Sequence, residues 1–283
     1  MAEARPSSTI SSSNPSLSSK KRGLRESLHS WLSAASDALV SVIFPAECRI
    51  CSELLVDSRR VPICPRCLAS FDRIPSTVCE ICGCPLSGLQ LKEGQQGLCS
   101  ACQNKTYGFD CARSFAVYKG PLIRAILLLK FEEIEPLGAW FAEKLSEVLE
   151  SERDRFPADV VVPVPLHRQR ERERGYNQAA LISKPLAKRL RLPHKTLLMR
   201  TKARPDKRIL TPEERWESVR GAFATRPGSH VDNLRVLLVD DVLTTGATLD
   251  ACARALREAG AKSVVGLTVA RAIRNPLPRS AEW

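Results

Sequence analysis

The chain has 283 residues, of which 43% are hydrophobic, so it is long enough for about two domains with apolar cores. Its formal net charge is +12, which favours an anionic partner such as a phosphate, a nucleotide, a nucleic acid or a membrane surface. No apolar stretch approaches the roughly 20 residues that a membrane-spanning helix requires. These features argue against an integral membrane protein.

The N-terminal region predicts a tail followed by one helix. Residues 1–23 are rich in Ser and poor in apolar residues, so we expect them to be disordered. Over residues 24–44, apolar side chains recur at helical spacing among polar ones, which predicts an amphipathic helix. No continuous apolar core of a signal peptide follows the basic cluster at 20–22, so we expect a cytoplasmic protein. Residues 276–283 are expected to form a short C-terminal tail.

Cysteine pairs dominate residues 45–111. Nine of the 11 cysteines lie between positions 48 and 102, and disulfides do not persist in the cytoplasm. A Cys-x-x-Cys turn places two thiolates on one side, and two such turns complete a tetrahedral zinc site without an open position. No histidine lies in this region. We therefore predict a zinc-ribbon module with two structural Zn²⁺ ions, whose ligands are Cys48, Cys51, Cys64, Cys67, Cys79, Cys82, Cys99 and Cys102.

The pairing of these four turns has two solutions. Sequential pairing gives two stacked ribbons with short loops, whereas pairing the first turn with the third gives an interleaved module. We favour sequential pairing because each loop is then short. Cys84 is a spare thiol beside the third turn and a competing ligand candidate. The module is either a folding staple or a surface for nucleic acid or a partner protein, and the spacing does not separate the two.

Residues 112–275 show the alternation of strands and helices that is typical of an α/β domain. The strands are short, continuous apolar runs, which indicates a parallel sheet with both faces covered. Strands are predicted over residues 160–164, 235–239 and 263–269. Helices are predicted over residues 121–129, 137–151, 178–191 (interrupted or kinked at Pro185) and 248–259.

The segment after the strand at 235–239 combines two acids with a Thr-rich turn into a helix. A helix start presents unpaired N–H groups and a dipole that favours an anion. A glycine in the turn permits close approach or a positive φ angle. Carboxylates at the carboxyl edge of a sheet, where ligands bind, can accept hydrogen bonds from vicinal sugar hydroxyls. The segment therefore predicts a ribose-phosphate site made of Asp240, Asp241, Thr244, Thr245, Gly246, Ala247 and Thr248.

This signature resembles that of type I phosphoribosyltransferases, and the wider set of motifs resembles the ComF family of competence-associated proteins. The shared motifs are the cysteine pairs, Leu129-Lys130-Phe131, Pro163-Val164-Pro165 and Arg174-Gly175-Tyr176-Asn177-Gln178. The resemblance implies a type I phosphoribosyltransferase-like parallel sheet behind a double zinc ribbon. It also implies a role in DNA uptake together with a helicase-like partner.

By the same resemblance, the site residues take distinct roles. Asp240 and Asp241, the candidate catalytic residues, would hold the ribose 2- and 3-hydroxyls of 5-phosphoribosyl 1-pyrophosphate (PRPP). The turn at 244–248 would surround the 5-phosphate, with Mg²⁺ on the pyrophosphate. Lys130 and Arg174 are further candidates for substrate binding. The basic run at 168–174 is either a solvated surface or a source of one arginine for the pyrophosphate. The chain departs from the family pattern at Glu132, Glu133, Lys207 and Ser218.

Two classes of function follow from these features. The first is an enzyme that transfers phosphoribosyl from PRPP to an unidentified acceptor. The second is a non-catalytic accessory that handles single-stranded DNA, and a regulator that senses PRPP lies between them.

Overall fold

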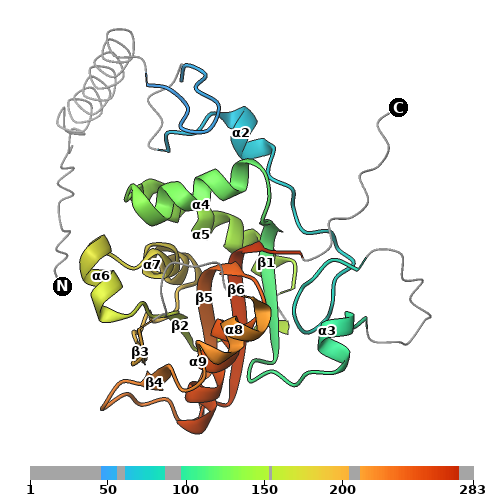
Figure 1. Cartoon of the computed structure of the whole chain (residues 1–283), viewed down its shortest axis with the longest axis vertical. Coiled ribbons are helices and arrows are strands. Elements are labelled where there is room, and N and C mark those ends of the chain that lie inside the picture. The colour runs from blue at the N-terminus through green and yellow to red at the C-terminus, as the bar shows by residue number, and fades with distance from the viewer. Residues whose placement is uncertain (1–45, 56–60, 87–96, 153–154, 204–210, 274–283) are drawn as a thin grey trace, which may run out of the picture.

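The computed structural model describes residues 46–55, 61–86, 97–152, 155–203 and 211–273. The expected tail at 1–23, the expected helix at 24–44 and the tail at 276–283 lie outside these ranges. The main sheet has four parallel strands in the order β1-β6-β5-β2 (Figure 1). Their bounds are β1 (Cys111–Val117), β2 (Val160–Pro163), β5 (Arg235–Leu243) and β6 (Ser263–Arg271).

The apolar strand runs bury both faces of this sheet, as predicted. Successive side chains of a strand point to opposite faces. Accordingly, Val236 and Leu238 of β5 belong to one hydrophobic cluster, and Leu237 and Val239 belong to another. Both faces of the sheet are therefore apolar, and each must be covered by other elements.

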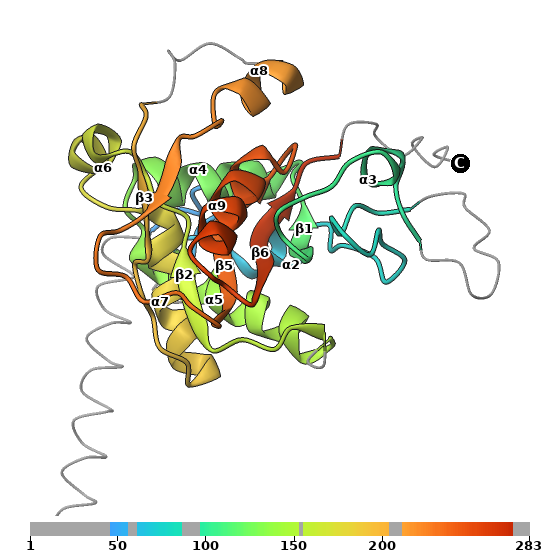
Figure 2. The ribbon, with the colours of Figure 1, turned by 90° about the horizontal axis from the view of Figure 1, so that it is seen from below.

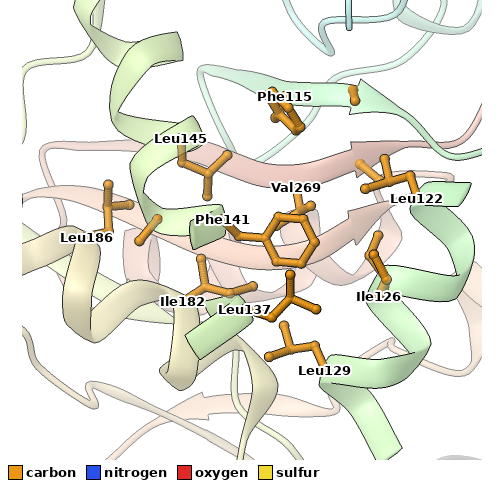
Figure 3. Packing of buried hydrophobic residues seen from close by; sticks show 14 of the residues in the cluster. Phe115, Leu122, Ile126, Leu129, Leu137, Phe141, Leu145, Ile182, Leu186 and Val269 are labelled. Atoms are coloured by element: carbon orange, nitrogen blue, oxygen red, sulfur yellow. The ribbon is translucent and has the colours of Figure 1, made fainter. Parts of the chain in front are cut away.

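Helices supply these two covers (Figures 1 and 2). Around Phe141, apolar side chains from the helices meet those of β1 and β6 in the first cluster (Figure 3). On the opposite face, α9 buries Leu249, Cys252, Ala253 and Leu256, the stripe expected from its sequence. The first cover consists of α4 (Pro121–Phe131), α5 (Glu135–Glu150) and α7 (Gln178–Leu190), and the second is α9 (Ala247–Glu258).

Helix α7 runs without a break through Pro185, so the interruption expected there was wrong. A proline has no N–H for the carbonyl four residues earlier, which is that of Leu181. This carbonyl faces Gly138 of α5, where an added Cβ would lie only 2.7 Å from the Leu181 oxygen. The absence of a side chain at position 138 thus makes room for the carbonyl that Pro185 leaves without its helical hydrogen bond.

Gly138→Ala is expected to lower the free energy of unfolding. The new Cβ would press on a backbone oxygen, and forced shifts in a packed core cost about 1–3 kcal/mol. Urea unfolding of the zinc-loaded chain measures the effect, with the exposed Ala139→Ser on the same helix as the control, expected within about 0.5 kcal/mol of wild type. A Gly138→Ala variant as stable as the wild type would show that α5 and α7 can move apart without a loss of unfolding free energy.

Four short elements within residues 112–275 were not predicted from the sequence. Helix α6 ends at Gly175, whose φ of +82° is suited to a glycine. Helix α8 begins with a capping box between Thr211 and Glu214. A small antiparallel sheet pairs the other two elements. The four are α6 (Arg168–Arg174), α8 (Pro212–Glu217), β3 (Leu198–Arg200) and β4 (Phe223–Thr225).

The cysteine-rich region docks on the sheet domain at two separate places. The first ribbon, which carries α2 (Pro65–Ala69), shares the cluster that contains α4 and α5. The second ribbon, which carries α3 (Ser100–Gln103), lies along β1, where the Ala112 N–H donates to the Ile81 carbonyl at 2.6 Å. None of the helices in the described ranges combines the length and apolarity needed to cross a bilayer.

Candidate functional site

The eight paired cysteines form two clusters that follow the sequential pairing. Within each cluster the sulfur atoms all lie within 4.8 Å of one another. Cys84 belongs to neither, so the competing role considered for it is not seen. In the first cluster, the Cys64 and Cys67 N–H groups donate to the Cys48 and Cys64 sulfurs at 3.3 and 3.4 Å. Such four-sulfur sets fit structural Zn²⁺ and leave no position for a substrate.

A cavity of about 410 Å³ opens at the carboxyl edge of the sheet. It lies where the end of β5, the start of α9, the end of α4 and one side of α6 meet. All but one of the residues expected in the ribose-phosphate site line it, namely Lys130, Arg174, Asp240, Asp241, Thr244, Thr245, Ala247 and Thr248. The remaining one, Gly246, lies within the same loop.

The two acids lie inside β5 rather than after its end. The strand continues to Leu243, and Val242 still pairs with Ala270 of β6. Asp241 is 7% exposed at its side chain, with Oδ1 at 3.1 Å from Lys130 Nζ. Its Oδ2 is buried and has no hydrogen-bond partner among the described residues. A buried acceptor of this kind normally has a partner, so the cavity offers a hydrogen-bond donor a place to bind.

Asp240 is buried beside Asp241, and its Oδ1 accepts from the Asp241 N–H at 2.9 Å. Burial, followed by the neighbouring carboxylate of Asp241, raises the pKa of Asp240 to about 8. The backbone hydrogen bond and the positive charges of Lys130 and Arg200 act in the opposite direction. Asp240 therefore holds its proton near neutral pH.

Asp240→Asn is expected to stabilise the ligand-free protein increasingly as the pH rises. From about pH 4 to pH 8, Asp240 is protonated in the folded chain and ionised in the unfolded chain. The folded state then binds more protons, so wild-type stability falls by up to about 1.4 kcal/mol per pH unit across this window. Urea unfolding at pH 5, 7 and 9 should show that the difference in unfolding free energy between the variant and the wild type widens with pH and levels above pH 8. The exposed Asp72→Asn is the control, and a gap that stays constant for Asp240→Asn would contradict the assignment.

The turn after β5 has the positive φ angle that was predicted for its glycine. Gly246, with a φ of +84°, is the N-cap residue of α9 and has no side chain to cap it, and the helix begins at Ala247, one residue earlier than expected. The Ala247 N–H donates to Thr245 Oγ1 at 3.3 Å. The start of α9 therefore directs backbone donors and the positive end of the helix dipole toward the cavity. We call residues 244–248 the phosphate loop.

Basic side chains also line the cavity. Arg170 and Arg174, one helical turn apart on α6, line it, whereas Arg168 and Arg172 border a separate depression outside. The run at 168–174 is thus divided between the cavity lining and the surface outside it. Five cationic residues face two carboxylates in the lining, and the five are Lys130, Arg170, Arg174, Arg200 and Arg215. This excess favours an anionic ligand.

Three features of the site escaped the sequence analysis. Phe131 stands 69% exposed at the cavity, with the Arg174 guanidinium 5.1 Å from its ring centroid. Tyr176 holds the end of α4, because its hydroxyl donates to the Leu129 carbonyl at 2.9 Å and accepts from the Glu133 N–H at 3.0 Å. Burial raises the pKa of Tyr176 and lowers that of Arg174. The motifs contain these residues, but their contacts cross from one motif to another.

Comparisons with known proteins agree with both halves of the structure. Residues 39–103 match the double zinc ribbon domain, and residues 176–283 match the phosphoribosyl transferase domain. Among solved structures, the glutamine PRPP amidotransferase from B. subtilis is 23% identical, covering 47% of this chain and 25% of that chain with a TM-score of 0.30. The adenine phosphoribosyltransferase from Thermoanaerobacter pseudethanolicus is 17% identical, covering 49% and 81%, also with a TM-score of 0.30.

Curated relatives match different shares of the chain. Competence protein F of Haemophilus influenzae is 35% identical over 116 residues, which is 40% of this chain and 51% of that protein. Competence protein ComFC of Bacillus subtilis is 30% identical, covering 74% of this chain and 84% of that protein. DNA utilization protein YhgH of Escherichia coli is 30% identical, covering 71% and 87%. The chain therefore belongs to the ComF family, with a phosphoribosyltransferase-type domain behind a double zinc ribbon.

Proposed function

We propose that the cavity binds PRPP or another ribose 5-phosphate. The observation that carries this proposal is the buried Asp241 Oδ2, which has no hydrogen-bond partner among the described residues and lines the same cavity as the uncapped start of α9. A ligand that carries hydroxyl donors beside a phosphate satisfies both features at once. The excess of cations in the lining supports further negative charge on that ligand.

The proposed roles follow from position. The ribose hydroxyls donate to Asp241 and Asp240, and the phosphate loop surrounds the 5-phosphate with backbone N–H groups and threonine hydroxyls. Lys130, Arg170 and Arg174 lie where they can face the pyrophosphate. Mg²⁺ bound to the pyrophosphate supplies neutralisation of its charge.

In a transfer reaction, the bond from C1 of the ribose to the pyrophosphate breaks while the acceptor attacks C1. The carboxylates hold the ribose as positive charge develops on its ring, and the cations stabilise the departing pyrophosphate. No nucleophile from the protein is needed, because the acceptor supplies it.

Titration calorimetry of the zinc-loaded chain with PRPP and Mg²⁺ tests the binding. The double substitution Asp240→Asn with Asp241→Asn is expected to weaken binding by at least about 100-fold, because the ribose hydroxyls lose the carboxylate acceptor of Asp241 and the carboxyl acceptor of Asp240. The surface variant Asp72→Asn, which lies outside the cavity, should bind as the wild type does. A folded wild type that binds neither PRPP nor ribose 5-phosphate would overturn the proposal.

We further propose that the chain serves in DNA utilization, because its relatives are named competence and DNA utilization proteins. The second candidate is a non-catalytic protein, either an accessory for single-stranded DNA that acts with a helicase-like partner or a PRPP sensor. The outward-facing Arg168 and Arg172, which border a depression of about 380 Å³, favour it.

The two candidates separate in one binding assay. Fluorescence anisotropy with single-stranded DNA across 50–300 mM salt should show a steep salt dependence if phosphates are neutralised. Under the accessory role, binding weakens in Arg168→Ser with Arg172→Ser and persists in Asp241→Asn. Loss of DNA binding in Asp241→Asn alone would place the DNA in the cavity, and absence of binding would exclude the accessory role.

A further inference from the structure

Arg271 occupies an unusual position between the phosphate loop and the second cysteine cluster. It is the last residue of β6, is buried, and pairs in register with Leu243 at the end of β5. Its Nη1 donates to the carbonyls of Leu243 at 3.0 Å, Ala272 at 3.1 Å and Thr244. Its Nη2 lies 3.6 Å from the sulfur of Cys82. One guanidinium thus contacts both the first residue of the phosphate loop and a zinc-ligand candidate.

The charge of Arg271 needs a counter-charge in this position. A buried cation is costly unless it is paired, and the described residues include no carboxylate that forms an ion pair with Arg271. Its partners are carbonyl oxygens and the Cys82 sulfur. Four thiolates carry more negative charge than one Zn²⁺ neutralises, so a metal-loaded cluster supplies the missing counter-charge. Groups that donate to metal ligands also orient those ligands.

A second set of contacts joins the same ribbon to the same loop. The ring of Tyr107, which follows the last ligand Cys102, lies 3.0 Å from where a Cβ on Gly246 would stand. Next to it, the Gly108 N–H donates to Asp250 Oδ1 at 2.6 Å, within the first turn of α9. The chain that leaves the second cluster therefore packs over the phosphate loop, while Arg271 holds the loop at its first residue.

The first cluster has a different environment. It lies against the hydrophobic cluster that contains α4 and α5. Its contacts with the sheet domain include the Arg49–Glu132 ion pair and a hydrogen bond of 3.4 Å that the Arg124 side chain donates to the Arg49 carbonyl. Among the described residues, none of these contacts touches residues 244–248. The two zinc sites therefore contact different parts of the sheet domain, and of the two only the second is next to the phosphate loop among the described residues.

We propose that Arg271 is a positioning residue that couples the second zinc cluster to the phosphate loop, so that the geometry of the loop depends on zinc in that cluster and not in the first. The consequence for PRPP rests on the proposed function, whereas the consequence for the loop itself does not. Loss of zinc or oxidation of thiolates in the second ribbon would then lower the affinity of a cavity whose described lining includes none of the zinc-ligand cysteines.

Hydrogen exchange of the ligand-free, zinc-loaded chain tests the coupling directly. In Arg271→Met, a peptide covering residues 243–250 should exchange at least about tenfold faster than in the wild type, because the carbonyl anchors are lost. Arg271→Lys keeps the charge but not the fork of donors, and should show a smaller change in the same direction. PRPP affinity should fall by about 10- to 100-fold in Arg271→Met, the usual cost of losing an outer-shell partner.

Arg113→Met is the matched control. Arg113 is also a buried arginine that reaches the second ribbon, since its Nη1 donates to the Glu80 carbonyl at 3.1 Å and its Nε pairs with Glu152. Its contacts within the described residues are with Glu80, Ala112, Glu152 and Phe156 and not with the phosphate loop. Its loss should therefore lower global stability without faster exchange at 243–250. Equal loosening of the loop in Arg113→Met and Arg271→Met, or unchanged exchange in Arg271→Met, would overturn the coupling.

The dependence on zinc has its own pair of variants. Cys51→Ser and Cys99→Ser each remove one ligand, from the first and the second cluster respectively, and each should lower the zinc content by one ion per chain. Only Cys99→Ser should speed hydrogen exchange at 243–250. Cys99 does not contact Arg271 directly, so this effect would come from the loss of zinc and not from a lost contact. Faster exchange in both variants, or in neither, would contradict the proposal. If the wild type binds neither PRPP nor ribose 5-phosphate, the proposed function fails while the exchange data still decide the coupling.

Discussion

Cys64→Ser is expected to release the first zinc ion and to destabilise the side of the sheet domain that α4, α5 and α7 cover. Structural zinc binds with an apparent free energy of about 10–16 kcal/mol, and that energy is available only to the folded ribbon. Cys64 is buried in the cluster that also holds Phe71 and Phe115. Trp140 of α5 packs edge-on against both rings, at 5.8 and 5.9 Å between centroids. Loss of the ribbon therefore exposes part of the core beneath it.

Zinc content and thermal unfolding measure this effect. The variant should retain one zinc per chain, where the wild type retains two, and should unfold at a clearly lower temperature. Cys84→Ser is the control, because this half-buried thiol lies in the same module but in neither cluster. It should keep both zinc ions and change stability little. A Cys64→Ser variant that keeps two ions, or a Cys84→Ser variant that loses one, would contradict the assigned ligand sets.

Lys130→Met is expected to cost about 3 kcal/mol of unfolding free energy. Lys130 is 21% exposed and is the cation that pairs with the buried Asp241 in the ligand-free cavity. Removing one partner of a buried pair leaves an uncompensated charge, which costs about 3–5 kcal/mol. We take the lower end of this range because the lysine is partly solvated. Urea unfolding at pH 7 measures the loss.

The companion variants show whether the charge is the cause. Adding Asp241→Asn to Lys130→Met should recover most of the lost stability, because the unpaired charge is then gone. Lys119→Met breaks an exposed ion pair with Asp72, and should change stability by no more than about 1 kcal/mol. If Lys130→Met is as mild as Lys119→Met, or if the second substitution recovers nothing, the pair does not hold Asp241 as described.

The strand–turn–helix backbone around residues 244–248 could be predicted because its features are contiguous. The two acids, the threonines and Gly246 follow one another, and each has a local physical use at a strand–helix turn. The zinc ligands were predictable for the same reason, since each pair is a local turn. The end of β5 was misplaced because Asp240 and Asp241 interrupt the apolar run, while the ladder with β6 continues past them.

Contacts between distant segments could not be predicted in this way. Arg271 and Cys82 are 189 residues apart, and nothing near either residue marks the other as a partner. Strand β1 was missed because Arg113 and Ser114 break its apolar pattern, although both are buried and hydrogen-bonded in the structure. Strands β3 and β4 have three residues each, too few to show a period.

A crystal structure of the zinc-loaded chain with PRPP and Mg²⁺ tests the central claim most directly. The account predicts the 5-phosphate against the backbone N–H groups of residues 244–248 and the ribose hydroxyls on Asp241 and Asp240. The pyrophosphate should then face Lys130 and the Arg170–Arg174 side of α6. A phosphate bound elsewhere on the chain, or a cavity in which the ribose does not touch either carboxylate, would contradict it.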